Sequence, residues 1–382
     1  LVGVLCAYKL KERGVPCLLV EGKRIGSGVT GNTTAKITAQ HGLIYDKLLC
    51  DFGAEAARKY YEINMRARAE YEKLAAQFPC DFEKKTAYTY SMRDRSKIEN
   101  EAYAYEKLGI QPTVTDSTPL PFRVAGAIGM EDQAQFNPLK FLYGIASVPD
   151  IRENTFVHHL EADTAYTANG SIKAKAIVIA THFPFVNVPG LYFLKMYQHR
   201  SYVIALENGP QLDGMYVDES EKGHSFRNYQ NFLLLGGGDH KTGKAGGMYD
   251  EIRALARKAY PECRETYAWA TQDCMTLDSV PYIGVHRKSK THTYVATGFN
   301  KWGMTGSMAA AGVLSDLITG GKSEYEDLFS PQRSMLQPQL FVNGANALVN
   351  FLHFGKRCPH LGCALQWNKV EQSWDCPCHG SR

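Results

Sequence analysis

The apolar positions near the start of the chain predict a helix followed by a buried strand. Residues 4–13 have apolar side chains at helical spacing, and Gly14 stands where a helix C-cap would be. The continuous apolar run 17–20 ends at Glu21. A run of this kind is typical of a strand covered on both faces in a parallel sheet. Helix, short loop, strand and acid together indicate the second half of a βαβ unit.

Further along the chain, helical and strand patterns alternate. Helices are predicted over 54–78 and 95–108, from an Asn137 cap and Pro138 to about 147, and from about 302 to 318. Apolar runs predict buried strands at 155–157, 176–180 and 294–296, and alternating patterns predict antiparallel strands at 202–206 and 232–235. One sheet domain is therefore expected to form from distant pieces, with a second, antiparallel domain interleaved with it.

Charge and composition exclude several classes of protein. Forty-three basic and 39 acidic residues leave a net charge of +4 over 382 residues, too small and dispersed for a dedicated nucleic-acid binder. No apolar run approaches the ~18–20 residues of a spanning helix, so no transmembrane segment is predicted. We expect a cytoplasmic globular protein.

The cysteines are distributed unevenly. Six of the ten are scattered and resemble lone buried thiols, whereas the other four cluster between positions 358 and 378, among histidines. Cys358-x-His360 and Cys376-x-x-His379 provide two thiolates and two imidazoles from two tight turns. A structural zinc site needs the same ligand types. A Rieske [2Fe–2S] centre uses two cysteines on one iron and two histidines on the other.

These two turns resemble the Rieske family closely. The resemblance implies that Cys358 and Cys376 bind one iron, that His360 and His379 bind the other, and that a disulfide joins Cys363 to Cys378. Rieske loops stand on an all-β domain, but only the short segment 340–357 separates the predicted linker (330–339) from Cys358, and nothing follows Arg382. We therefore expect residues 340–382 to form a partial all-β Rieske domain.

A second motif concerns a dinucleotide. Glu21 follows Gly3 at the spacing where an acid ending strand two would bind ribose hydroxyls. Leu1-Val2-Gly3 fits the tail of a glycine-rich turn whose first strand and earlier glycines lie outside the sequence. On this interpretation both ends of the protein are truncated.

The rest of the chain resembles the FAD-dependent oxidoreductases of the D-amino-acid oxidase (DAO) type, in the subgroup with a C-terminal Rieske domain. The segments that carry the resemblance are Leu18–Glu21, Gly28–Lys36, Gln40–Leu43, Ile177–His182, Leu235–His240, Trp269–Asp273 and Ala296–Thr305. The implied fold is α/β, a Rossmann-like FAD-binding domain interleaved with an antiparallel-sheet substrate domain. The implied boundaries are 1–329 for the flavoprotein, with FAD-binding segments at about 1–50, 136–182 and 270–329 and substrate-domain segments at about 51–135 and 183–269.

The resemblance also implies a set of FAD contacts. Gly3 and its helix would face the pyrophosphate, Glu21 the ribose, Val157 the adenine, and Gly298 to Thr305 the flavin pyrimidine end, where a helix N-terminus stabilises negative charge. The complete set is Gly3, Glu21, Lys23, Thr30, Gly31, Asn32, Thr33, Thr34, Val157, Ala180, Thr181, Gly298, Trp302, Gly303, Met304 and Thr305. Gly236 to Gly238 is interpreted as a tight turn rather than a phosphate loop.

The catalytic residues are left open. Arg227 is a candidate for holding a substrate carboxylate, although a structural or solvated arginine fits the pattern equally well. His240 is a second candidate, and it and His182 are also explained as structural residues.

The implied activity is oxidation of a C–N bond in a small amine or amino acid by hydride transfer to flavin. Electrons would then pass to the Rieske cluster and to an unidentified acceptor. Two alternatives stay open: a flavin and iron–sulfur electron-transfer protein without an amine substrate, and a non-functional fragment of the enzyme.

Overall fold

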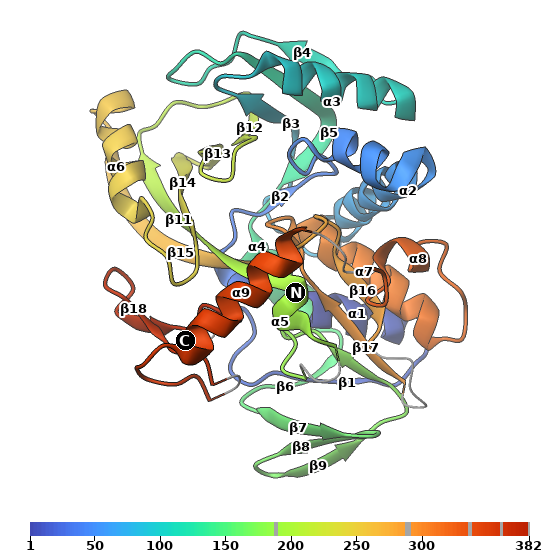
Figure 1. Ribbon diagram of the computed structural model, residues 1–382. Coiled ribbons are helices and arrows are strands. Elements are labelled where there is room, and N and C mark those ends of the chain that lie inside the picture. The colour runs from blue at the N-terminus through green and yellow to red at the C-terminus, as the bar shows by residue number, and fades with distance from the viewer. Residues whose placement is uncertain (187–189, 287–291, 335–337, 360–361, 381–382) are drawn as a thin grey trace.

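The computed structural model describes residues 1–186, 190–286, 292–334, 338–359 and 362–380 (Figure 1). The first helix, α1 (Val2–Glu12), leads into β1 (Leu18–Val20), as the apolar pattern predicts. Strand β1 pairs in parallel with β6 (Asp150–Arg152), which comes much later in the chain. This parallel pair is the local βαβ-like unit.

A second small sheet belongs to the same half of the molecule. Strand β10 (Ile177–Ile179) pairs in parallel with β17 (Thr293–Thr297), which pairs antiparallel with β16 (Tyr282–Val285). The chain then enters α7 (Gly303–Ile318), which packs against α1. The expected assembly of one α/β domain from distant segments is thus observed.

The second half is a nine-stranded mixed sheet. Its order is β15-β11-β14-β13-β12-β3-β5-β2, with β4 on β5. The strands are β2 (Lys36–Ile37), β3 (Glu83–Ser91), β4 (Thr113–Thr115), β5 (Gly126–Gln135), β11 (Met196–Glu207), β12 (Gly214–Asp218), β13 (Ser225–Tyr229), β14 (Phe232–Lys241) and β15 (Arg264–Thr276). Helix α6 (Met248–Ala259) packs on β14 and β11. In Figure 1 the sheet extends from the side covered by α6 to the side where α2 and α3 lie.

The remaining elements surround these two sheets. They are η1 (Val29–Asn32), α2 (Ile44–Ala75), α3 (Arg95–Leu108), α4 (Pro138–Ala146), β7 (Val157–Glu161), β8 (Thr164–Thr167), β9 (Gly170–Lys173), α5 (Tyr192–Lys195) and α8 (Glu326–Phe329). The predicted strand at 155–157 is displaced, because only Val157 of that segment is in a strand. The helix predicted from residue 54 is observed directly after a non-helical break at Gly53 (φ 82°), and a further helical segment, which was not predicted, precedes the break from Ile44.

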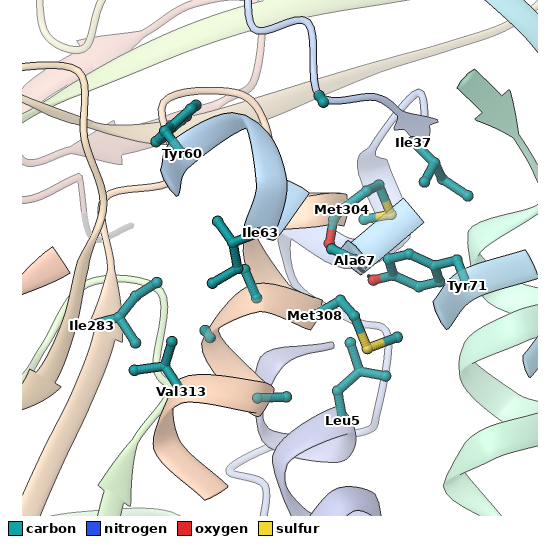
Figure 2. Close-up of a cluster of buried hydrophobic side chains, with 14 of the residues drawn as sticks. Leu5, Ile37, Tyr60, Ile63, Ala67, Tyr71, Ile283, Met304, Met308 and Val313 are labelled. Carbon is teal, nitrogen blue, oxygen red and sulfur yellow. Dashed lines mark hydrogen bonds between the residues drawn. The ribbon is translucent and has the colours of Figure 1, made fainter. Parts of the chain in front are cut away.

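The main hydrophobic core joins helices that are far apart in the sequence. Figure 2 shows side chains from α1, α2 and α7 meeting those of β2 and β16. Each is at most 5% exposed: Leu5, Ile37, Tyr60, Ile63, Ala67, Tyr71, Ile283, Met304, Met308 and Val313. The Tyr71 hydroxyl donates a hydrogen bond to the Met304 carbonyl (2.9 Å), so its burial leaves no unpaired donor. This packing fixes α1 and α7 relative to each other.

The C-terminal region differs from the predicted all-β domain. It consists of α9 (Pro338–Leu352) and a hairpin of β18 (Gln366–Asn368) and β19 (Ser373–Asp375). Helix α9 begins within the predicted linker because its apolar residues recur at helical spacing. Arg333, also in that linker, donates to Asp278 (2.6 Å), which lies between β15 and β16.

Helix α9 buries a polar side chain and exposes apolar ones. The buried side chain of Asn343 donates to the carbonyl of Leu194 (3.0 Å). The opposite face is exposed and entirely apolar, a pattern found where a helix is covered by another molecule or segment. The residues of that face are Phe341, Val342, Ala345, Leu348, Val349 and Leu352.

Across the described ranges, none of the helices combines the length and apolar character needed to cross a membrane. The cytoplasmic location stays a prediction.

Candidate functional site

A cavity of about 1990 Å³ runs between the two halves of the molecule. Its walls come from residues 1–44, 155–183 and 271–307, with parts of β11, β12 and β14. Small-molecule pockets in proteins usually have ~300–1,000 Å³. The cavity therefore has room for a dinucleotide and a substrate together.

At one end of the cavity lies the start of α1. Its first-turn N–H groups have no intrahelical partner and no side-chain cap, and Leu1 to Val4 line the wall. Such a helix end attracts phosphate. A Cβ on Gly3 would lie 3.0 Å from Leu19 Cδ1, so glycine lets the helix approach β1 closely. Glu21, at the end of β1, also lines the cavity and accepts a hydrogen bond from the Lys23 amide (2.9 Å).

Most of the predicted FAD contacts lie on this one cavity. Those that line it are Gly3, Glu21, Lys23, Thr30, Thr33, Thr34, Val157, Ala180, Thr181, Trp302, Gly303 and Met304. The others, Gly31, Asn32, Gly298 and Thr305, are neighbours of lining residues. The carbonyl of Asn32 accepts from Trp269 Nε1 (2.9 Å), and the Thr305 hydroxyl donates to the Thr38 carbonyl (3.0 Å).

Gly298 explains why this turn needs a glycine. Its φ is +74°, and a Cβ there would lie 2.3 Å from Thr276 Cγ2. The turn leads into α7, whose first residues Gly303 and Met304 line the cavity without a side-chain cap. The N-terminus of α7 therefore supplies unpaired N–H groups at the end of the cavity where the flavin ring is predicted.

His41 is buried beside that turn, and the predictions do not include it. Its ring stacks on Trp302 (centroids 4.9 Å apart), and Nδ1 lies 2.6 Å from the Tyr60 hydroxyl. Burial lowers the pKa of His41 to about 3, so the ring is neutral. It positions Trp302 at the cavity wall.

The two histidines considered for catalysis have different surroundings. The His240 ring lies within 3.0 Å of the Tyr202 hydroxyl and of the Lys241 carbonyl, and it is not part of the cavity wall. These contacts account for it as a structural residue. His182 lines the cavity, and burial lowers its pKa to about 4.

Arg227 is buried beneath the cavity rather than on its wall. Its Nη2 donates weakly to the Phe136 carbonyl (3.4 Å), while Nε and Nη1 have no hydrogen-bond partner among the described residues. Burial lowers the pKa of Arg227 to about 10. Lys36, which does line the cavity, has its pKa lowered to about 7 by burial and by Arg227. Two cations with few partners thus lie near one another at this part of the site.

Replacing Lys36 by methionine should stabilise the protein in a pH-dependent way. The folded chain binds the proton of the Lys36 ammonium group less tightly than the unfolded chain, where the lysine pKa is near 10.5. Burial of the charged Lys36 therefore destabilises the fold fully below pH 7, and this destabilisation vanishes as the pH rises to 10.5. Each pKa unit corresponds to ~1.4 kcal/mol, and cavity water screens part of it, so we expect a gain of roughly 2–4 kcal/mol at pH 6.

Urea unfolding at pH 6, 8 and 9.5 measures the effect of Lys36→Met. The control is Lys73→Met, a side chain on α2 that is 65% exposed, which should change stability equally little at each pH. A stability difference between wild type and Lys36→Met that is constant across this range would contradict the prediction.

The glycine run 236–238 is not a turn. It lies within β14, where the pairing with β11 shifts register between Arg200 and Tyr202, and Gly238 has φ +65°. A bulge of this kind redirects a strand and its side chains. Asp239, which follows it, is turned toward the cavity.

The C-terminal ligand site is assembled from two loops. Sγ of Cys358, Sγ of Cys376 and a ring nitrogen of His379 lie within 4.8 Å of one another, all buried. His379 Nδ1 is 2.9 Å from Cys376 Sγ. A disulfide joins Cys363 to Cys378. His360, the fourth predicted ligand, lies outside the described residues.

These residues fit a bound cluster. Three ligands of the types that Rieske centres use converge at one buried point, and the disulfide links the two loops beside it. The zinc alternative uses the same ligand types, so only metal analysis separates the two. The FAD site fits as well, because two uncapped helix N-termini and Glu21 face one cavity.

The ligand loops are attached to the flavoprotein body. Arg200 of β11 is fully buried, and its Nη2 lies 3.1 Å from Asp375 Oδ2 while Nη1 lies 3.8 Å from Glu371 Oε2. Gln272 Nε2 donates to the Gly380 carbonyl (2.9 Å). His379 and Gly380 consequently line the same cavity as the predicted FAD contacts, with the His379 ring at the edge of Phe183 (centroids 5.5 Å apart).

Several charged residues of the cavity wall are absent from the predicted set, and Asp239, Asp273 and Lys301 are three of them. Each lies in one of the segments that carry the DAO resemblance. The signal in the sequence was a single charge within an otherwise apolar or glycine-rich segment. Their convergence depends on the fold.

Comparison with known proteins agrees with this geometry. The family model described as FAD dependent oxidoreductase (DAO) matches residues 1–317. The chain is 34% identical to a Bacillus subtilis (strain 168) protein named as a Rieske 2Fe-2S iron-sulfur protein, YhfW, over 100% of this chain and 88% of that one. A stretch of 25 residues is 64% identical to the cytochrome b6-f complex iron-sulfur subunit 2 of Trichormus variabilis, covering 6% of this chain and 14% of that one.

Among solved structures, the fold resembles L-proline dehydrogenase from P. horikoshii. The TM-score is 0.71, with 18% identity over 87% of this chain and 94% of that chain. At this identity the likeness concerns the fold alone.

Proposed function

Because the chain belongs to the DAO family of FAD-dependent oxidoreductases, we propose that it oxidises the C–N bond of an amine or amino acid and passes the electrons to a Rieske cluster on the same chain. FAD and a [2Fe–2S] cluster, when bound, supply a hydride acceptor and a one-electron acceptor. The oxidised substrate is an imine, which water hydrolyses to a carbonyl compound and an amine or ammonia. The final electron acceptor is not identified.

One observation carries this proposal. The cluster ligand His379 lines the cavity that also contains the predicted FAD contacts. A shared cavity wall would keep the two proposed redox sites close to each other, as electron transfer between them requires. The match of a 25-residue stretch to an iron–sulfur subunit supports the proposal that this chain carries an iron–sulfur site.

The chain's own residues have three tasks. The N-terminus of α1 and Glu21 would hold the pyrophosphate and ribose of FAD, and the N-terminus of α7 would face the flavin pyrimidine. The walls of the cavity would orient the substrate C–H bond and exclude water. Lys36 would attract a substrate carboxylate, which in turn favours its ammonium form, with Arg227 adding positive charge behind it.

Anaerobic reduction of the purified holoprotein tests the proposal. We expect an amine or amino acid to bleach the flavin absorption and then produce the electron paramagnetic resonance signal of a reduced Rieske cluster. NADH, at the same concentration, should do neither within the same time.

Two results would contradict it. Reduction by NADH and by no amine or amino acid would favour the electron-transfer alternative. A purified protein that contains neither flavin nor iron would favour the fragment alternative.

A further inference from the structure

Three charged side chains from different segments meet at one part of the cavity wall. Asp239 comes from β14, Asp273 from β15 and Lys301 from the loop between β17 and α7. Strands β14 and β15 flank β11 in one sheet, and the loop before α7 comes from the other half of the molecule. None of the contacts predicted for FAD uses any of the three.

The cluster has an acceptor with no protein partner. Lys301 Nζ lies 2.5 Å from Asp239 Oδ2. The other carboxylate oxygen, Asp239 Oδ1, has no hydrogen-bond partner within the part of the chain that the structure describes, although Asp239 is only 8% exposed. A buried carboxylate oxygen without a donor is costly and marks a place where a ligand can donate.

Lys301 pairs with Asp239 and also acts electrostatically on the second carboxylate, Asp273. Burial raises the pKa of Asp273 to about 6, Asp239 adds to the rise, and Lys301 opposes it. His199, opposite Asp273 on β11, is neutral because burial lowers its pKa to about 4, with Lys301 also contributing. Lys241 on the same strand as Asp239 is turned to the ring of Tyr197. At pH 8 the cluster thus has an excess of negative charge toward the cavity.

The backbone that presents Lys301 is strained. Asn300 and Lys301 have φ of 50° and 72°, values that are uncommon for residues with a side chain. Asn300 fixes the loop, since its Oδ1 accepts a hydrogen bond from the Thr276 amide (2.7 Å) and its Nδ2 donates to the Gly298 carbonyl (2.8 Å). Strain that the surroundings enforce in this way is concentrated at functional sites.

We propose that Asp239, Asp273 and Lys301 form a subsite for the cationic amino group of the substrate. The free oxygen of Asp239 and the carboxylate of Asp273 accept its N–H groups, and Lys301 holds Asp239 in place. A carboxylate group of the substrate is repelled here and belongs at Lys36. The substrate class is therefore an amine whose charged nitrogen enters between two carboxylates. This inference rests on the proposed function, because it assigns a part of the same cavity.

Two probes of the same shape and opposite charge test the subsite. The tert-butylammonium ion has N–H donors but no hydrogen on the carbon bonded to nitrogen, so hydride transfer is impossible, and pivalate replaces its ammonium by a carboxylate. Each probe is titrated at pH 8 into flavin-loaded holoprotein. The dependence of the change in the flavin spectrum on the probe concentration gives the dissociation constant. Binding is measured without turnover, so the result does not depend on whether amines reduce the flavin.

Variants of the three residues should change the dissociation constant in opposite directions. Asp239→Asn and Asp273→Asn, which keep side-chain shape, should each weaken tert-butylammonium binding by about 10-fold or more and leave pivalate binding equal or tighter. Lys301→Met should tighten tert-butylammonium binding, because two carboxylates then face the cavity without a competing cation. Asp218→Asn, a carboxylate elsewhere on the cavity wall, is the matched control and should change neither constant.

The opposite signs separate recognition from a merely structural role. If Lys301→Met and Asp239→Asn both weaken tert-butylammonium binding, the cluster is structural and the subsite is wrong. Tighter binding of pivalate than of tert-butylammonium by the wild type would also overturn it. If the probes behave as expected while no amine reduces the flavin, the subsite stands and the proposed reaction fails alone.

Discussion

Replacing Arg200 by methionine should release residues 364–380 from the flavoprotein body. Arg200 is fully buried between Asp375 and Glu371 of the β18–β19 hairpin, and it also donates to Gln272 Oε1 (3.0 Å). Removing the cation leaves two carboxylates in this interface without the positive charge that faces them. Breaking a buried ion pair on one side costs ~3–5 kcal/mol.

Hydrogen–deuterium exchange of peptides covering 364–380 measures this release. We expect exchange there to rise by two orders of magnitude or more, while peptides of α2 and α7 keep the wild-type rate. The matched control is Arg264→Met. Arg264 also pairs with a carboxylate, Glu207, but its side chain is 75% exposed, so this variant should lower the free energy of unfolding by less than ~1 kcal/mol.

A second variant keeps the interpretation independent of global stability. Adding Asp375→Asn to Arg200→Met removes one of the two carboxylate charges that face this position and should restore part of the protection. Unchanged exchange at 364–380 in Arg200→Met would show that the hairpin is held by other contacts.

Replacing Cys376 by serine should abolish the cluster and leave the flavin. Cys376 Sγ lies at the centre of the ligand group with Cys358 and His379, and serine does not offer a thiolate. We expect iron and acid-labile sulfide to fall close to zero per chain and the flavin spectrum to persist.

The disulfide provides the comparison. The double variant Cys363→Ala, Cys378→Ala removes a cross-link between residues 15 apart, worth about 3 kcal/mol in chain entropy, but no predicted ligand. It should keep the cluster with lower thermal stability. Zinc in place of iron in the wild type would contradict the Rieske assignment and favour the zinc alternative.

Local signals in the sequence predicted some elements to the residue. Helix α3 spans Arg95–Leu108 as predicted, because Asp94 accepts from the Ser96 amide and Gly109 (φ 74°) ends the helix. Asn137 likewise caps α4 through the amides of Leu139 and Lys140 (3.1 Å each). In these cases the residues that decide where a helix begins are its own neighbours in the sequence.

Long-range partners explain the elements that were displaced or missed. The part of α2 before the break at Gly53 was missed. It begins at Ile44 because Glu101 from α3 accepts the amides of Tyr45 and Asp46 (3.0 and 2.8 Å), a cap that no local pattern contains. Strand β6 is short and polar, and it exists because it pairs with β1.

The same reason limits prediction of the site. Residues in the glycine-rich turns beside FAD belong to recognisable motifs, and most of them line the cavity. For Asp239, Asp273 and Lys301 the local signal is only a charge within a recognisable segment, and their proximity results from the arrangement of β14, β15 and the loop before α7. Arg227 shows the reverse, because its charge suggested a cavity residue and the fold buries it below the wall.

The contact between α1 and α7 has a consequence during synthesis on the ribosome. Leu5 on α1 is fully buried, and α1 packs on α7, which begins at Gly303. At ~5–20 residues per second, the partner of α1 leaves the ribosome roughly 15–60 s after α1 itself. For that time the apolar face of α1 has no native partner in the nascent chain, which favours non-native contacts and binding to chaperones. FAD can likewise bind only late in synthesis, because the cavity is complete only after α7 has been made.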